Sequence, residues 1–276
     1  MVDWLLSHAS QFQTYLLLGS FGAVAVWEWA ASRRPFATPL GTRWFNNVSL
    51  AALGLLLSRL CVPVAAFAFA TLAEQRGWGL FNHVALPRWL SAMLGIVLLD
   101  LGSYGQHRLF HALPLLWRFH KIHHSDLDVD CGTALRHHPV ETIAAIAFDL
   151  ALIAVFGIAP LAVLLGATLM IVASIFNHGN VVVHPMTDRL LRNIVVTPDM
   201  HRIHHSVSAG ESNRNFSNLL PWWDYVFATY QREPLLGHVR MQLGIADART
   251  ATELTLFKLL VLPFRRARAP ALAEST

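Results

Sequence analysis

The sequence predicts an all-α protein: an integral membrane helical bundle that carries a histidine-rich helical cap. Two properties of the 276-residue chain predict this class. The composition is 54% hydrophobic and only 14% charged, with a mean hydropathy of +0.44, which is unlike an ordinary soluble domain. The apolar residues are also gathered in long runs, whereas most of the 15 histidines lie in the polar stretches that follow them. We therefore expect one membrane-embedded domain over residues 1–276.

The apolar runs predict three single spans and one helical hairpin, because a bilayer crossing needs about 20 apolar residues. The runs cover residues 15–31, 48–73, 88–106 and 142–177. The last run is interrupted at Gly157 and Pro160, and each half is shorter than a usual crossing. It could form one bent helix or two tilted spans. We favour a hairpin that returns to its starting side.

Basic residues predict the orientation of these spans. Arg33, Arg34 and Arg43 follow the first run, and the positive-inside rule places such a loop in the cytoplasm. Residues 107–141 and 178–276 would then form a cytoplasmic cap on a multi-pass protein. The same rule accounts for the net charge of +4 without nucleic acid. The first residues lack a basic segment, so no cleavable signal is expected, and two cysteines make no disulfide framework.

Histidines recur in the cap at helical spacing. The pattern H-x-x-H-H occurs at 120–124 and again at 201–205, and His107 and His111 form an H-x(3)-H pair upstream. Residues three and four apart share one face of a helix, so each motif points several imidazoles the same way. At this histidine content, about 0.04 chance matches to H-x-x-H-H are expected. The repeated motif therefore indicates a metal site.

Eight clustered imidazoles are too many for one tetrahedral ion and fit two ions with open positions. Imidazole binds iron, zinc, copper and nickel alike. Two further histidines are added to the predicted ligands because of their position in the cap: His178, at the end of the hairpin, and His138. The predicted ligands are His107, His111, His120, His123, His124, His138, His178, His201, His204 and His205.

Other residues near these motifs are assigned supporting places. His137 and His184 are expected behind the ligands or at the surface, although His184 could replace His138 in completing the set. Asp199 and Glu211 are expected to accept hydrogen bonds from ligand histidines, as carboxylates often do. The sequence contains no G-x-S-x-G, P-loop or G-x-G-x-x-G motif. We therefore expect no catalytic residue beyond the metal ligands and no site for an organic cofactor.

With these three motifs, the chain resembles the fatty acid hydroxylase / sterol desaturase superfamily of membrane di-iron enzymes. The resemblance covers roughly residues 25–232 and departs from the family pattern at His137, where an aromatic residue is expected. It implies two iron ions, O₂ as co-substrate, and hydroxylation of a C–H bond in a lipid or sterol-like substrate from the bilayer. No fused cytochrome b5 domain is visible, so it also implies a separate electron donor of the ferredoxin or cytochrome type.

Three alternatives stay open at this point. A desaturase of the same family would use the same ligands, and hydroxylation is favoured only by analogy with the close spacing of the motifs. A zinc-dependent membrane hydrolase would need Asp199 or Glu211 as a base beside a metal-bound water. A metal transporter or sensor would place its ligands near the middle of the membrane, whereas these histidines lie outside the apolar runs.

Overall fold

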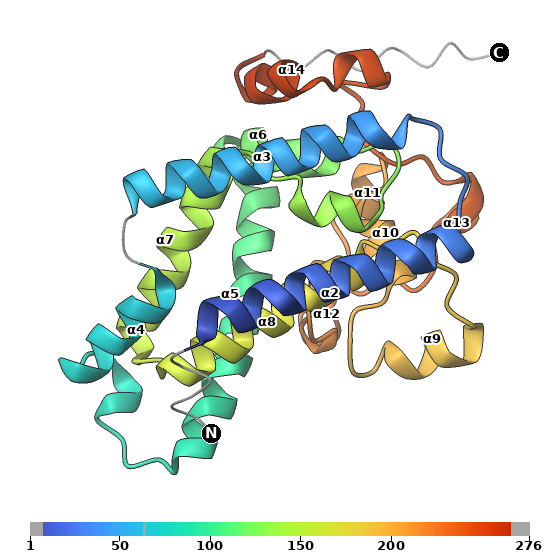
Figure 1. The fold of residues 1–276 in the computed structure, drawn as a ribbon. Coiled ribbons are helices and arrows are strands. Elements are labelled where there is room, and N and C mark those ends of the chain that lie inside the picture. The colour runs from blue at the N-terminus through green and yellow to red at the C-terminus, as the bar shows by residue number, and fades with distance from the viewer. Residues whose placement is uncertain (1–7, 63–64, 266–276) are drawn as a thin grey trace.

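The computed structural model describes residues 8–62 and 65–265, and within them the chain forms helices and no β-strand (Figure 1). This confirms the predicted all-α class. The first half contains α2 (Ala9–Ala30), α3 (Leu40–Cys61), α4 (Ala66–Gln75), η1 (Leu80–Asn82), α5 (Arg88–Ala112), α6 (Pro114–His124), η2 (Cys131–Leu135), α7 (Pro139–Phe156) and α8 (Pro160–Asn177). The second half has shorter helices: α9 (Pro185–Leu191), α10 (Pro198–His204), α11 (Ala209–Ser212), α12 (Trp222–Val226), α13 (Gly237–Arg240), η3 (Ala251–Glu253), α14 (Leu256–Val261) and η4 (Leu262–Phe264).

Three stretches are long and apolar enough to cross a membrane: α7, α8 and Leu40–Asn82, the last of which includes residues 63–64, outside the described part of the chain. Helices α2 and α5 contain the predicted runs 15–31 and 88–106, but they are not among the three; they carry the acidic residues Glu28 and Asp100. The predicted run 48–73 is not one straight helix, because α3 ends at Cys61 and α4 begins at Ala66. Val62 precedes a proline and has a non-helical backbone (φ −131°, ψ 77°), as this position favours.

Helices α7 and α8 are the two arms of a V (Figure 1). Gly157 ends α7 in the left-handed conformation (φ +66°), and Pro160 opens α8 at a position that needs no N–H donor. From this turn α7 packs against α3 and α4, whereas α8 packs against α2 and α5. At the tip of the V, the backbone at Gly79 packs directly against the backbone at Gly157. A Cβ on Gly79 would lie 2.0 Å from the nitrogen of Gly157.

Helices α2 and α3 brace the segments that follow two of the predicted ligand histidines. Glu28 of α2 accepts hydrogen bonds from the backbone N–H groups of Cys131 (2.7 Å) and Asn180 (2.8 Å). Arg43 of α3 forms a buried ion pair with Asp126 (2.9 Å). Asp126 follows His124 by two residues, and Asn180 follows His178 by two residues, so these contacts fix the chain just beyond two predicted ligands.

The arginines that predict the orientation have structural partners of their own. Arg33 pairs with Asp199, and Arg34 donates to the backbone of His238 and Met241. These partners belong to the histidine-bearing half of the chain. The arginines thus share a side with the histidines, and the cytoplasmic orientation of that side stays a prediction.

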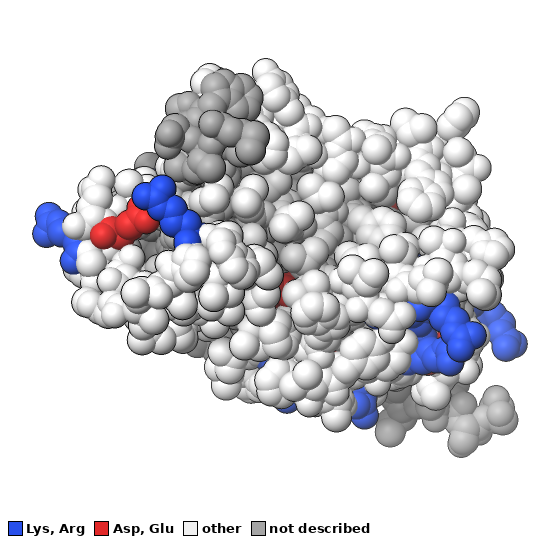
Figure 2. Space-filling view, turned by 90° about the horizontal axis from the view of Figure 1, so that it is seen from below, with Lys and Arg blue, Asp and Glu red and all other residues white. Residues whose placement is uncertain are grey.

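The surface is largely uncharged where the long helices are exposed. Figure 2 shows a wide white expanse, with Lys and Arg mostly toward its two ends. On α3, the outward side chains of Leu55, Leu56 and Leu60 are 55%, 56% and 71% exposed. An apolar surface of this kind fits a lipid surrounding better than water.

Candidate metal centre

Nine of the ten predicted ligands converge on two adjacent clusters in the described part of the chain. The five-histidine cluster contains His107, His111, His120, His124 and His204. The four-histidine cluster contains His123, His178, His201 and His205. Within each cluster, one ring nitrogen per residue lies within 4.8 Å of all the others.

The two H-x-x-H-H motifs divide their histidines between the clusters in opposite ways. On α6, His120 and His124 are one turn apart and enter the five-histidine cluster, whereas His123 turns to the other. At α10, His201 and His205 enter the four-histidine cluster, and only His204 joins the first. The helical spacing therefore builds two adjacent sites from the same pair of motifs.

The ring nitrogens approach one another as ligands of a shared ion would. In the four-histidine cluster, His178 Nε2 lies 3.1 Å from the Nε2 atoms of His123 and His201 and 3.2 Å from that of His205. Two nitrogens bound at right angles to one ion, with bonds of about 2.1 Å, would be about 3 Å apart. The separations therefore fit metal coordination.

Backbone carbonyls fix the tautomer of several of these rings. The Nδ1 atoms of His107 and His204 lie 2.7 Å from Phe216 O and 2.8 Å from Arg214 O, so both nitrogens must donate. In the neutral rings this leaves two lone pairs facing each other across 2.9 Å between Nε2 atoms. Burial, followed by the nearby ring of His120, lowers the pKa of His107 to about 3, which keeps its imidazole neutral. A cation between the rings would relieve this repulsion, so the donor set fits a metal ion.

The four-histidine cluster is prepared in the same way. His178 Nδ1 donates to Ser174 O at 2.7 Å, and burial lowers the pKa of His178 to about 3. Burial, then neighbouring imidazoles, holds the pKa values of His201 and His205 well below their usual range. Neutral imidazoles are the form that binds metals.

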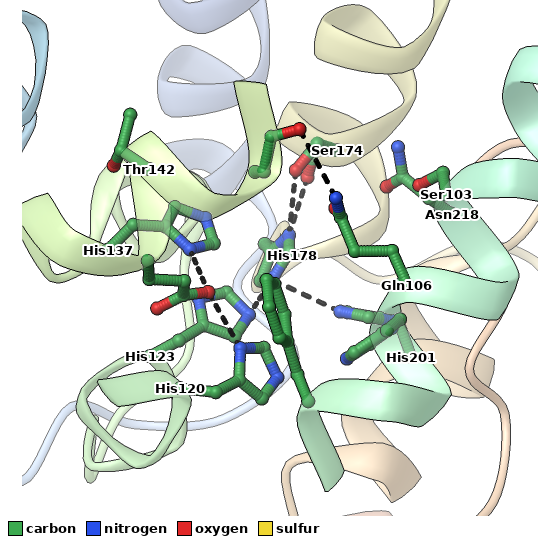
Figure 3. A pocket seen from close by; sticks show the side chains of 14 residues that line it. Ser103, Gln106, His120, His123, His137, Thr142, Ser174, His178, His201 and Asn218 are labelled. Atoms are coloured by element: carbon green, nitrogen blue, oxygen red, sulfur yellow. Dashed lines mark hydrogen bonds and ion pairs between the residues drawn. The ribbon is translucent and has the colours of Figure 1, made fainter. Parts of the chain in front are cut away.

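Glu141 supports the five-histidine cluster and was not expected from the sequence. Its Oε1 atom accepts from His120 Nδ1 (2.7 Å) and His137 Nδ1 (2.9 Å), and these two rings lie close together in Figure 3. His120 Nε2 is left buried without a hydrogen-bond partner among the described groups, as a nitrogen reserved for a metal would be. The available signal was a lone acid in the first turn of an apolar helix, three residues after the pair His137 and His138.

The placement of His138 contradicts its prediction. It caps α7: Nδ1 accepts from Val140 N (3.2 Å), and Nε2 lies 3.3 Å from Leu260 O. Its neighbour His137 instead stacks on His123, with ring centroids 4.5 Å apart. His138 has an extended backbone just before the helix, and adjacent side chains in extended chain point to opposite sides. His184 caps α9 and lies in neither cluster.

The expected roles of Asp199 and Glu211 were also wrong. Asp199 is an ion-pair partner of Arg33 (3.3 Å) and Arg202, rather than of a clustered imidazole. Glu211 accepts from the Ser206 hydroxyl and from the backbone N–H of Leu235, both at 2.6 Å. Both acids organise the chain around α10 without contacting the clustered imidazoles.

A cavity of about 250 Å³ leads to both clusters (Figure 3). Helices α5, α7 and α8 form its walls, and the polar or small wall residues include Ser103, Gln106, Thr142, Ala145 and Ser174. Histidines of both clusters line it too: His107, His120, His123, His178 and His201. Part of a small or narrow substrate could therefore reach either cluster.

A second cavity, of about 290 Å³, reaches the five-histidine cluster at His124. Lys121 and Asp247, which form an ion pair, line it together with Trp117. The Trp117 ring lies 4.9 Å from His111 and 5.4 Å from His124, measured between centroids. The five-histidine cluster is therefore reached by two cavities, and these two cavities share no lining residue.

Comparisons with known proteins agree with this arrangement. The family model named fatty acid hydroxylase matches residues 92–229. The chain is 34% identical over 202 residues to the ornithine lipid hydroxylase OlsE of Rhizobium tropici, covering 69% of this chain and 58% of that protein. It is 30% identical to the alkylglycerol monooxygenases of Homo sapiens and Danio rerio, covering 52% and 56% of this chain but only 31% and 34% of those proteins.

The chain thus spans between a third and three fifths of the length of these relatives. No solved structure matches it significantly. The relatives are lipid hydroxylases and monooxygenases, and three apolar helical stretches accompany the family match, as in a membrane protein. The match over residues 92–229 includes every histidine of both clusters, and the chain therefore belongs to the fatty acid hydroxylase family.

Proposed function

We propose that this protein is an O₂-dependent di-iron oxidoreductase that hydroxylates a C–H bond of a lipid or sterol-like substrate. One observation carries the proposal: two clusters of imidazoles, with nitrogens about 3 Å apart, lie beside one cavity. The names of the relatives, an ornithine lipid hydroxylase and alkylglycerol monooxygenases, support the same reaction class.

Each cluster would hold one iron ion. Iron in these sites would supply the activation of O₂ that attack on an unactivated C–H bond requires. The protein's own part is positioning: carbonyls and Glu141 orient the rings through Nδ1, which leaves Nε2 for the metal. One oxygen atom would enter the C–H bond, and the other would leave as water with two electrons and two protons.

The substrate would enter from the bilayer. Two walls of the cavity, α7 and α8, are long and apolar enough to cross a membrane, so a lipid can approach between them. We place the protein as a multi-pass membrane enzyme with its site on the cytoplasmic face. There a separate ferredoxin or cytochrome would deliver electrons, and the cavity beside Trp117 and His124 offers it an approach to the metals.

The hydrolase alternative has less support. Asp199 and Glu211, its two candidate bases, are held by other groups. Glu141 lies beside the cavity, but two imidazoles engage the same carboxylate oxygen. A desaturase would use the same ligands, and it is distinguished by its product.

Oxygen labelling tests the proposal. The gently purified protein should contain close to two metal ions, mainly iron, and with a reductase couple and membrane lipid it should add one labelled oxygen atom from O₂ to a lipid. His124→Ala and His205→Ala, one from each cluster, should abolish this product, whereas His184→Ala should not. A product lighter by two hydrogens would instead identify a desaturase, and lipid cleavage without O₂ would identify a hydrolase.

A further inference from the structure

Polar side chains surround the cavity one helical turn away from the histidine clusters. On α5, Ser103, Gln106, His107 and Phe110 occupy positions i, i+3, i+4 and i+7 of one helix face, and all line the cavity. On α8, Ser174 precedes His178 by four residues and lines it as well. One face of each helix therefore presents a serine one turn before an imidazole, and on α5 Gln106 lies directly beside that imidazole.

These polar groups have unused hydrogen-bonding capacity. Gln106 Nε2 donates to Ala145 O (3.3 Å) across the cavity, and its Oε1 atom has no partner among the described groups (Figure 3). Within the same part of the chain, the Ser103 hydroxyl makes no hydrogen bond. The Ser174 backbone oxygen accepts from His178 Nδ1, so the Ser174 hydroxyl, 3.4 Å from that nitrogen, can donate elsewhere. All three groups are half-buried and face the cavity. A hydrocarbon that displaced water from them would leave them unpaired at a cost in free energy, whereas a polar group of the substrate could bond them.

We infer that Ser103, Gln106 and Ser174 form a polar subsite that binds an oxygen- or nitrogen-bearing group of the substrate close to the carbon that is oxidised. This inference rests on the proposed function. It assigns the substrate to lipids with a hydroxyl, ether, ester or amide near the reacting carbon. All three side chains can both donate and accept hydrogen bonds, so they suit such neutral groups.

The helix geometry sets the distance between that group and the oxidised carbon. Ser103 and Ser174 each lie four residues from a clustered histidine, which is about 6 Å along a helix axis. An extended chain covers this length in about four or five bonds, at roughly 1.3 Å of advance per bond. Hydroxylation is therefore expected within about five bonds of the polar group, and not in the middle or at the methyl end of an acyl chain.

Product analysis tests this placement. The purified enzyme, with O₂ and a reductase couple, would be given ornithine lipid, an alkylglycerol, a free fatty acid and a sterol, and tandem mass spectrometry would locate each new hydroxyl. We expect it within about five bonds of a headgroup oxygen or nitrogen. A hydroxyl at mid-chain or at the methyl end would overturn the subsite while leaving the proposed function intact.

Binding gives a readout that does not depend on turnover. Octadecylglycerol should raise the melting temperature of the wild-type protein, and octadecane, with the same chain but no polar group, should not. Gln106→Leu and Ser103→Ala should weaken octadecylglycerol binding about three- to tenfold, as expected for one lost hydrogen bond. Ser91→Ala is the matched control, because it lies on the same helix but does not line the cavity.

Two binding results would overturn the inference: equal binding of octadecane and octadecylglycerol, or unchanged octadecylglycerol binding in both variants. Metal content of each variant would be measured alongside, since Gln106 adjoins His107. If Gln106→Leu fails to fold, Ser103→Ala decides alone. If no lipid is oxidised by the metal-loaded protein, the proposed function fails, and the binding comparison still decides the subsite.

Discussion

At the scale of single residues, Glu141 is the acid most closely tied to the candidate metal centre. One of its oxygens accepts from both His120 and His137, and the side chain is buried. Carboxylates in this position orient a ligand ring and make it more basic, and their loss typically weakens metal binding 10–100-fold. Glu141→Gln removes the charge but keeps the shape. We therefore expect this variant to lose metal to a chelator about tenfold faster than wild type.

Glu211→Gln is the control for this prediction. Glu211 is equally buried, at 4% exposure, but it binds Ser206 and Leu235 instead of an imidazole. Its metal loss should stay within about threefold of wild type, because no clustered ring depends on it. Equal rates in the two variants would mean that the carboxylate of Glu141 does not support the centre.

The structure and the sequence prediction disagree on which of the adjacent residues His137 and His138 lies beside the clusters. His138→Ala removes a cap of α7 and should destabilise the protein by about 1 kcal/mol without changing its metal content. His137→Ala removes the ring that stacks on His123 and bonds Glu141, so metal should be lost more readily. Metal analysis and thermal unfolding of both variants would test this. Metal loss in His138→Ala alone would restore the sequence prediction.

Residue spacing could predict most of this centre, and the exceptions have a physical cause. Two positions in one helix have a fixed angular relation, which is why all eight histidines of the three motifs fall in the two clusters. No such relation links separate elements. The carboxylate that supports His120 is Glu141, which comes from a different helix, α7. Asp199 lies only two residues before His201 in sequence, but it forms ion pairs with Arg33 and Arg202 instead.

At the scale of elements, the tip of the α7–α8 V depends on glycine for close approach. Gly77 and Gly79 both have positive φ, at +66° and +85°, but only a Cβ on Gly79 would meet backbone. Gly77→Ala should therefore cost only about 1–2 kcal/mol of left-handed strain. Gly79→Ala adds a 2.0 Å clash with Gly157 and should lower the melting temperature substantially more. Equal melting temperatures for the two variants would show that the tip is not packed as described.

Helix boundaries followed the sequence where proline or glycine marks them. Pro114 separates α5 from α6, Pro198 opens α10, and Gly157 with Pro160 divides α7 from α8. The direction of each helix after such a break depends on distant packing. The sequence therefore left open whether the two halves of 142–177 diverge, and contacts with α3, α4, α2 and α5 decide it.

At the scale of the whole molecule, Arg43 joins α3 to the segment after the first H-x-x-H-H motif. It bonds Asp126 at 2.9 Å and Asp130 at 3.0 Å, all three buried. Burial would raise the pKa of Asp126, but the charges of Arg43 and Arg136 and the hydrogen bonds from Arg43 and Thr133 together lower that pKa. Arg43→Met would leave two buried carboxylates without their partner and should cost about 3–5 kcal/mol. Thermal unfolding would measure it.

Arg118→Met provides the comparison, because Arg118 is exposed on α6 and its loss should change stability by less than about 0.5 kcal/mol. A melting temperature for Arg43→Met equal to that of Arg118→Met would argue that the ion network is dispensable. Loss of metal together with stability in Arg43→Met would show that the brace and the centre are coupled.

This bracing by α2 and α3 limits how the histidine-bearing segment can be moved between proteins. Neither helix contains a histidine, and both precede residue 92, where the family match begins. Yet Glu28 and Arg43 hold the turns beyond His178 and His124. A graft of residues 92–229 into another scaffold would leave Asn180 N–H and Asp126 without these partners. The transferable module is thus longer than the shared segment, and chimaeras within the family should retain activity only when residues 28–43 travel with the histidines.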